Sequence, residues 1–225
     1  MVKNMIKIDE FTGAIFDVDG TMLDSMWKWD EAEASFLSSF GVRPSDEEVE
    51  LLHTYSLIEV AGYFQSKYGV KKSISEITDE KNEMMDKFYF EEVELKPGVT
   101  DVLEKLRGFG IKMCVATATD KYLIEAGLKR LGILEYFGKI FTCGEENTTK
   151  TRPDIYIRAA EFLGTEINKT LVFEDAVHAV KSAKEAGFPI VAVYDKSADA
   201  HQKYIKDAAD YYYASMEEIS FQSKL

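Results

Sequence analysis

The stretch GAIFDVDGT, residues 13–21, places two aspartates two positions apart, directly behind a short apolar run. An apolar run of this length, closed by an Asp-Gly turn signal, is typical of a buried strand that ends at the turn. Asp17 and Asp19 would lie close together after that strand, and neighbouring like charges disfavour joint ionisation. A bound cation offsets that repulsion. The pattern therefore favours a metal-assisted site, and its alternative is a plain turn at the end of a strand.

Beyond residue 98, short apolar runs alternate with segments of helical period. Strands alternating with helices imply parallel pairing, so we predict an α/β fold with a doubly wound parallel sheet to which residues 13–16 also belong. The predicted strands are 13–16, 111–116, 139–142, 170–173, 189–194 and an edge strand at 210–213, and the predicted helices are 121–131, 153–163 and 176–186.

Residues 26–94 break this rhythm, because helical periods follow one another without a strand-like run. Ser25 can cap the first of these helices, and Pro97-Gly98 marks the return to the α/β pattern. We therefore expect an all-α domain, residues 24–95, inserted into a core domain of residues 1–23 and 96–225. The helices predicted within the insert are 26–40, 47–53, 57–68 and 75–90.

Composition narrows the function classes. The 225 residues carry a formal charge of −13, which argues against nucleic acid or an anionic membrane as a partner. No run approaches the roughly 18–20 apolar residues of a membrane span, and residues 1–10 lack the apolar region of a secretory signal. Cys114 and Cys143 lack the spacing of a zinc site or a disulfide framework. We expect a cytoplasmic monomer.

Polar residues also follow three of the other predicted strands. Thr117 follows 111–116, Lys150 lies in the loop after 139–142, and Glu174-Asp175 follow 170–173. Ligands of open parallel sheets bind beyond the carboxyl ends of the strands, so these groups should converge with Asp17. Each has an ordinary alternative: Thr117 could cap a helix, Lys150 could be solvated, and the acidic pair could stabilise a helix start.

Taken together, these residue types fit phosphoryl transfer, which depends on positioning and charge stabilisation. Asp17 would attack phosphorus, Asp19 would move protons, and Thr117 would donate its hydroxyl to a phosphoryl oxygen. Lys150 would neutralise charge between the phosphate and the nucleophile. The candidate phosphate-binding residues are Gly20, Thr21, Thr117, Ala118 and Lys150. The candidate Mg²⁺ ligands are Asp17, Asp19 through its backbone carbonyl, Glu174 and Asp175.

These motifs resemble the haloacid dehalogenase superfamily of phosphatases, in the subgroup with a helical cap that includes β-phosphoglucomutase-like and phosphoglycolate-phosphatase-like enzymes. DVDGT at 17–21 resembles its first motif, Thr117 the second, Lys150 with Pro153-Asp154 the third, and Phe173-Glu174-Asp175 the fourth. The resemblance covers nearly the whole chain. It implies a Rossmann-like core, Mg²⁺ dependence, an aspartyl-phosphate intermediate and a cap that opens and closes over a small phosphate ester.

Two departures from the family pattern bear on the reaction. Thr151-Arg152 separate Lys150 from Pro153, which leaves Arg152 as a second choice for the cation. Trp29 stands where the mutases of the subgroup carry a cap histidine, and residues 52–60 offer no arginine for a second phosphate. We therefore expect hydrolysis of small phosphorylated metabolites such as sugar phosphates. A phosphohexomutase is the alternative, and a binding module on an inactive version of this fold is the non-enzymatic one.

Substrate specificity should come from the helical insert. Its aromatic candidates for facing the cleft are Trp27, Trp29, Tyr63 and Phe64, although aromatic residues at helical spacing more often form a core. His53 is expected to be structural or exposed, and His178, close to the acidic pair in sequence, to support the site residues from behind or to lie at the surface. Cys143 is given no function.

Overall fold

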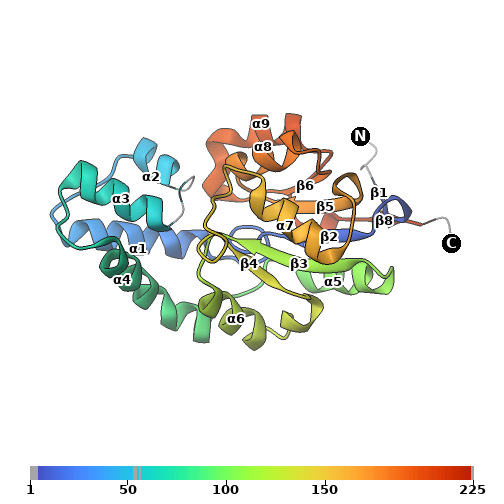
Figure 1. Cartoon of the computed structure of the whole chain (residues 1–225), viewed down its shortest axis with the longest axis horizontal. Helices are drawn as coiled ribbons and strands as arrows, with labels where there is room; N and C mark the ends of the chain where they lie inside the picture. Colours follow the sequence, from blue (N-terminus) through green and yellow to red (C-terminus); the bar gives the residue numbers. More distant parts are fainter. Residues whose placement is uncertain (1–4, 53–54, 56, 224–225) are drawn as a thin grey trace.

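The computed structural model describes residues 5–52, 55 and 57–223 of the chain. Six strands form one parallel sheet in the order β4-β3-β2-β5-β6-β7, with β2 near the middle (Figure 1). This confirms the predicted α/β class. The strands are β2 (Gly13–Phe16), β3 (Lys112–Thr117), β4 (Ile140–Thr142), β5 (Thr170–Glu174), β6 (Ile190–Val193) and β7 (Tyr211–Tyr213).

Helices cover both faces of the sheet, which is why its central strands are apolar on both sides. Phe16 packs toward α5 (Val99–Gly108) and α6 (Lys121–Arg130), and its ring stacks on that of Phe173 with the centroids 4.2 Å apart. Ile15, the preceding residue, packs on the opposite face. The helices on that face are α7 (Asp154–Leu163), α8 (Val177–Glu185) and α9 (Gln202–Ala208).

Four elements lie outside the sequence prediction. Helices α5 and α9 were not identified, nor were β1 (Ile6–Lys7) and β8 (Phe221–Gln222), which pair in parallel as a separate small sheet. This small sheet lies at the end of the molecule opposite the inserted helices (Figure 1). Two-residue strands carry no periodicity, so pattern reading has nothing to detect there.

The insert is helical, as predicted. Its helices are α1 (Met26–Ser38), α2 (Asp46–Leu52), α3 (Leu57–Tyr68) and α4 (Ile74–Lys87), followed by one turn of π-helix, η2 (Phe88–Glu92). A hydrophobic cluster of its own holds α1, α2, α3 and α4 together. Its buried members are Phe36, Leu37, Leu52, Val60, Ala61, Phe64, Val70 and Ile77.

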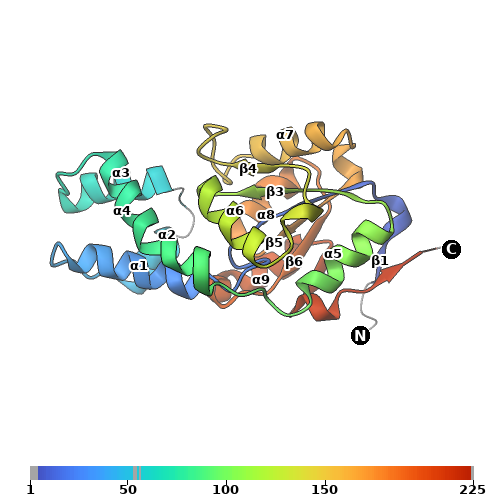
Figure 2. The same cartoon turned by 90° about the horizontal axis from the view of Figure 1, so that it is seen from below.

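The two connections of the insert lie side by side. Leu23 and Leu95 form an antiparallel bridge, the backbone N–H of Asp24 donates to the carbonyl of Glu94 at 3.0 Å, and Lys96 N–H donates to Met22 at 2.9 Å. The insert thus leaves and re-enters the α/β part at one place, and its helices form a lobe at one end of the molecule (Figure 2). The domain boundaries at 23/24 and 95/96 stay a prediction.

Candidate active site

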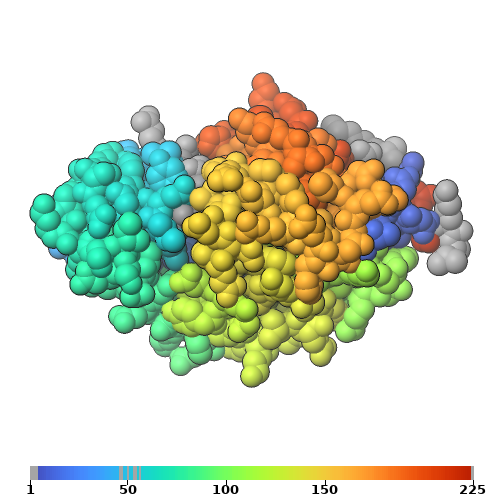
Figure 3. All heavy atoms as spheres, in the orientation of Figure 1, coloured from blue at the N-terminus to red at the C-terminus, as the bar shows by residue number. Residues whose placement is uncertain are grey.

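The polar residues predicted from the strand ends lie at one cavity. It lies at the carboxyl edge of the sheet, where the helical lobe meets the α/β part, and Figure 3 shows one face of the molecule with these two parts in contact. Residues from the α/β part that line it include Asp17, Asp19, Thr117, Ala118, Thr119, Lys150, Glu174, Asp175 and His178, and residues from the lobe include Met26, Trp29, Glu33, Leu52, Tyr55, Leu57 and Val60.

Asp17, Glu174 and Asp175 form a buried acidic cluster, each offering a carboxylate oxygen within 4.8 Å of the others. Lys150 is buried among them and donates to Asp17 Oδ1 and, at 2.6 Å, to Glu174 Oε1. Thr21 Oγ1 donates to Asp175 Oδ1 at 2.8 Å. Lys150 thus pairs with two of the three carboxylates of the cluster, Asp17 and Glu174.

The closeness of these buried carboxyl groups to one another and to Lys150 shifts their pKa values. Burial raises the pKa of Asp17 to about 6, against the opposing effect of the Lys150 charge. Burial, with Asp17 and Glu174 nearby, raises the pKa of Asp175 well above its usual range. Burial acts to lower the pKa of Lys150, but the Asp17 and Glu174 charges outweigh it and the net shift is upward. The cluster therefore resists full ionisation unless another cation enters.

The donor set fits a hard divalent cation. All its atoms are oxygens, which Mg²⁺ prefers. Asp17 Oδ2 is buried and has no hydrogen-bond partner within the described part of the chain. The turn at Gly20 passes close to the cluster. Gly20 has φ +86°, and a Cβ there would overlap the Asp175 carboxylate. Only glycine lets this turn pass so close to the acidic group.

Asp19 lies apart from the acidic cluster. Its Oδ1 accepts hydrogen bonds from Ser25 Oγ at 2.6 Å and from the Tyr89 hydroxyl, and its Oδ2 accepts from Thr119 Oγ1 at 2.8 Å. Burial raises the pKa of Asp19 in spite of these donors. Its side chain is therefore directed to hydroxyl groups, and its assignment as a metal ligand through the backbone carbonyl stays a prediction.

Ser25 is the N-cap residue of α1, as predicted, but its side chain makes no capping hydrogen bond. Its hydroxyl donates instead to Asp19 Oδ1, at 2.6 Å.

Sequence reasoning missed several residues that hold the site. Tyr89 and Ser25 hold Asp19 from the lobe, and Tyr156 donates to Glu174 Oε1 at 2.7 Å from α7. Lys96 donates to the carbonyls of Gly20 and Tyr194. Thr119 had a signal, since it shares the loop of Thr117, and Ser25 lies only six positions from Asp19. Tyr89, Tyr156 and Lys96 reach the site from more distant parts of the chain.

The remaining residues singled out in the sequence lie in different parts of the structure. Thr117 is buried at the cavity, and its Oγ1 accepts the N–H of Thr119 at 3.1 Å, which leaves its own proton available to a ligand. Arg152 is paired at the surface with Asp154 at 3.0 Å, so Lys150, rather than Arg152, lies against Asp17. His178 lines the cavity, and His53 lies outside the described residues.

Of the aromatic candidates in the insert, Trp29 lines the cavity. Its Nε1 donates to the Tyr89 hydroxyl at 2.9 Å, so it supports the residue that holds Asp19. Phe64 is a buried member of the hydrophobic cluster of the insert, and Tyr63 packs against that cluster. Trp27 is 53% exposed, and its ring contacts that of Phe88. For these three, packing explains the helical spacing.

Comparison with known proteins gives the same family as the motifs. The family model for haloacid dehalogenase-like hydrolases matches residues 14–193. A phosphorylated carbohydrates phosphatase of Thermotoga maritima is 27% identical over 77% of this chain and 80% of its own length. The fructose-1-phosphate phosphatase YqaB of Escherichia coli is 26% identical over 82% of this chain and 97% of its own.

A solved structure shows the same architecture. CbbY from Rhodobacter sphaeroides, determined in complex with phosphate, is 26% identical and superposes with a TM-score of 0.81 over 92% of this chain and 96% of its own. This chain belongs to the haloacid dehalogenase-like hydrolases. With relatives named as phosphatases, its class is that of the phosphoric monoester hydrolases. The resemblance inferred from the four motifs is thereby confirmed.

Proposed function

We propose that the protein is a Mg²⁺-dependent phosphatase of small phosphorylated carbohydrates. The observation that carries the proposal is the Asp17–Lys150–Glu174–Asp175 group at the floor of a cavity, with Asp19 beside it. Two relatives named for phosphorylated carbohydrates support the substrate class. A cytoplasmic location and a monomeric state are part of the same proposal.

The mechanism begins with Asp17 as the nucleophile. One of its carboxylate oxygens attacks phosphorus in line as the bond to the leaving oxygen breaks, which forms an aspartyl-phosphate. Asp19, whose raised pKa favours its protonated form, gives its proton to the leaving oxygen. Asp19 then takes a proton from water as that water attacks the aspartyl-phosphate, and inorganic phosphate leaves with Asp17 restored.

Other residues stabilise the transferred group. Thr117 and Ala118 line the cavity, which supports their proposed roles as donors to phosphoryl oxygens through the Thr117 hydroxyl and the Ala118 backbone N–H. Lys150, paired with Asp17, would supply a fixed positive charge. The backbone at Gly20 and Thr21 completes the proposed phosphate site. Mg²⁺, held by Asp17, Glu174, Asp175 and the Asp19 carbonyl, would offset the charge shared by the carboxylates and the phosphate.

The mutase alternative is not favoured. A mutase must bind a bisphosphate at both ends, yet the described lobe residues that line the cavity are mostly apolar or aromatic, and the charged one among them, Glu33, is an acid. Trp29 takes the place of the histidine expected there, and its polar atom is used by Tyr89. Hydrolysis is therefore the reaction we propose.

The test is release of inorganic phosphate from an aryl phosphate and a panel of sugar phosphates, with Mg²⁺ and with chelator. The proposal expects release that needs Mg²⁺ and needs no bisphosphate activator. Release from the sugar phosphates only after a bisphosphate is added, with isomerised product, would instead identify a mutase.

A further inference from the structure

A buried ion pair joins two helices of the lobe at the cavity. Lys81 of α4 donates to Glu33 Oε1 of α1 at 2.8 Å, and the Lys81 side chain is fully buried. Its Nζ lies 5.9 Å from the ring centroid of Trp29 and 5.6 Å from that of Phe64. Lys81 is therefore fixed behind Glu33, on the side away from solvent.

The second carboxylate oxygen of this pair is unused. Glu33 is 7% exposed and lines the cavity, and its Oε2 has no hydrogen-bond partner within the described ranges of the chain. A buried polar atom without a hydrogen bond is costly, so such an atom at a cavity wall is expected to serve a ligand. Its neighbours on this wall include Met26, Trp29 and Val60, which offer a ligand mainly apolar contact.

We propose that Glu33 is a specificity residue whose Oε2 accepts a hydrogen bond from a hydroxyl of the leaving group. This inference rests on the proposed phosphatase function, since that function places the phosphate at Asp17 and the rest of the substrate toward the lobe. It assigns a chemical task to one residue that the motifs leave unassigned.

Charge and hydrogen-bond type narrow the substrate class. Lys81 already compensates the Glu33 carboxylate, so a neutral hydroxyl satisfies Oε2 without a further cation. A second phosphate dianion offers acceptors only, and would face a carboxylate oxygen with no proton between them. The preferred substrates are therefore monophosphate esters of polyols and sugars, ahead of aryl esters and of bisphosphates.

The experiment measures kcat/KM of the wild-type protein and its variants for glycerol 3-phosphate, propyl phosphate, phenyl phosphate, aminoethyl phosphate and fructose 1,6-bisphosphate. In the wild type, glycerol 3-phosphate should exceed propyl phosphate by about tenfold or more, because the two differ only in hydroxyl groups. This arm needs no variant, so it remains informative even if a variant fails to fold.

Two variants test the residue itself. Glu33→Gln removes the charge, and Glu33→Leu with Lys81→Met removes both charges so that no lone ion stays buried. In the double variant, the ratio of glycerol 3-phosphate to propyl phosphate should fall about tenfold, toward one. Glu31→Gln is the matched control, since Glu31 lies on the same helix with its side chain exposed and paired to Lys28. There the ratio should stay within about twofold of wild type.

The outcomes separate the two proposals. Phosphate release from none of these esters would refute the proposed phosphatase and leave no basis for this one. An active wild type that does not distinguish glycerol 3-phosphate from propyl phosphate, or a ratio unchanged in the folded double variant, would overturn the role of Glu33 alone. A preference for aminoethyl phosphate over glycerol 3-phosphate, lost in Glu33→Gln, would overturn the hydroxyl assignment in favour of an ammonium donor.

Discussion

Individual side chains at the cavity meet very different surroundings although they lie close together. Asp17 shares its site with Lys150 and two further carboxylates, whereas Asp19 is surrounded by hydroxyl groups. The first environment suits a nucleophile that works beside a cation, and the second suits a group that carries a proton between partners. The assignment of roles to the two aspartates therefore follows from what surrounds each.

Replacing Asp17 should abolish turnover. In Asp17→Asn the nucleophilic oxygen is lost while size is kept, so we expect phosphate release to fall by about a thousandfold or more. The measurement is phosphate release at saturating sugar phosphate with Mg²⁺. Asp101→Asn, the same change at an exposed site on α5, is the control and should keep wild-type rates. If Asp17→Asn kept them too, the covalent mechanism would be wrong.

Adding one methyl group at Gly20 should disturb the acidic cluster. Gly20 and Gly41 both have positive φ, +86° and +71°, so alanine at either site should cost about 1 kcal/mol of folding free energy. Gly41 has open space around it, but a Cβ on Gly20 overlaps the Asp175 carboxylate.

Gly20→Ala should therefore need more Mg²⁺ for half-maximal activity, and Gly41→Ala should not. Mg²⁺ titrations of activity, together with urea unfolding of both variants, distinguish local displacement of the cluster from simple strain in the turn. Equal Mg²⁺ requirements in the two variants would contradict the close approach of this turn to the cation site.

The site could be predicted from sequence where its residues directly follow strands. Asp17, Thr117 and Glu174 come at the ends of apolar runs, and parallel pairing brings those ends to one edge. Tyr89 could not be found this way, because its contact with Asp19 spans 70 positions and depends on the packing of η2. Ser25 takes the predicted N-cap position, but its hydroxyl bond to Asp19 was not predicted, because a serine before a helix ordinarily bonds the helix backbone.

Among the elements, strands and inserted helices were predictable to within a few residues. Each strand of the six-stranded sheet is a short apolar run between polar segments, and α3 has the predicted bounds, Leu57–Tyr68. The helix predicted over 75–90 is interrupted, since α4 ends at Lys87 and η2 follows. There the helix widens to a π-turn, in which Val93 N–H donates to the Phe88 carbonyl at 2.7 Å, a backbone detail that side-chain periodicity does not encode.

Lys96 connects three elements and should matter for stability. From the return of the insert it donates to the Gly20 carbonyl, to the Tyr194 carbonyl at 2.8 Å and to Asp195 Oδ2 at 2.9 Å. Lys96→Met leaves these acceptors unpaired in a largely buried place, so unfolding free energy should drop by about 2–4 kcal/mol.

Lys184→Met is the matched control for that measurement. Lys184 pairs with Asp210 at 2.6 Å, but both side chains are well exposed, so its removal should cost no more than about 1 kcal/mol. Urea unfolding at pH 7 compares the two. Similar losses of unfolding free energy in the two variants would show that the buried hydrogen bonds of Lys96 contribute no more to stability than an exposed ion pair.

The pH dependence of the Lys96 contribution has a definite sign. Burial acts to raise the pKa of Asp195, but the Lys96 charge and hydrogen bond, together with hydrogen bonds from Ser197, outweigh it and the pKa falls below its usual 3.8. A carboxyl group with a lowered pKa stabilises the fold above the pKa of the unfolded chain, and that contribution is lost as pH falls through the folded value. The difference in unfolding free energy between wild type and Lys96→Met should therefore be constant from pH 5 to 7 and shrink below about pH 4. A difference that is unchanged at pH 3 would rule out this ion pair as its source.

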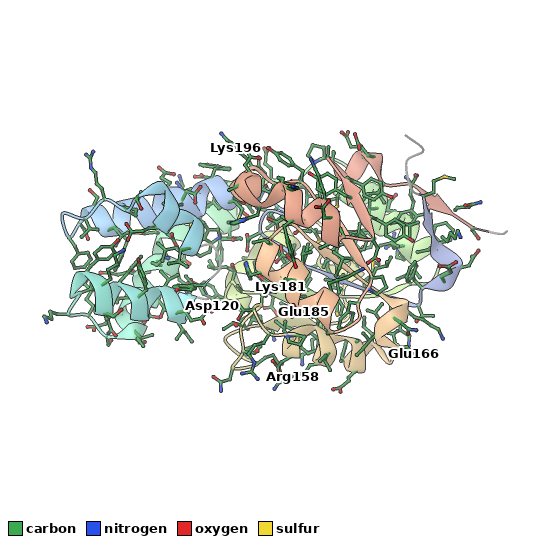
Figure 4. All side chains as sticks on the ribbon, turned by 90° about the horizontal axis from the view of Figure 1, so that it is seen from above. Asp120, Arg158, Glu166, Lys181, Glu185 and Lys196 are labelled. Carbon is green, nitrogen blue, oxygen red and sulfur yellow. The ribbon has the colours of Figure 1, made fainter. Side chains whose placement is uncertain are left out.

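At the scale of the whole molecule, the α/β part and the lobe contribute different residues to the cavity. The sheet edge carries the acidic cluster, and the lobe supplies a mainly apolar wall with Glu33 in it. Side-chain contacts join the two parts beside the cavity: Tyr122 of α6 donates to Asp86 of α4 at 2.7 Å, and Asn82 donates to Asp120 (Figure 4 labels Asp120 at this border). No helix within the described residues has the length and apolar character needed to span a membrane.

Mg²⁺ should stabilise the whole fold. It would bind the cluster of Asp17, Glu174 and Asp175 in the folded chain and find no such cluster in the unfolded one. At about a hundred times its dissociation constant, a ligand selective for the folded state adds about 2.7 kcal/mol. Urea unfolding with Mg²⁺ and with chelator measures this, and Glu174→Gln should reduce the gain. Equal midpoints with and without Mg²⁺ would contradict the cation site.

The bridge between Leu23 and Leu95 has a consequence for how such a chain can diversify. Because the insert leaves and returns at neighbouring backbone positions, its ends are only about one strand spacing, roughly 5 Å, apart. A gene segment encoding another helical module with equally close ends could replace it, as a cassette, without changing the sheet or the acidic cluster. Recombination at these two codon positions would then exchange the lobe wall of the cavity and keep the acidic cluster, so a new substrate specificity could arise in one event.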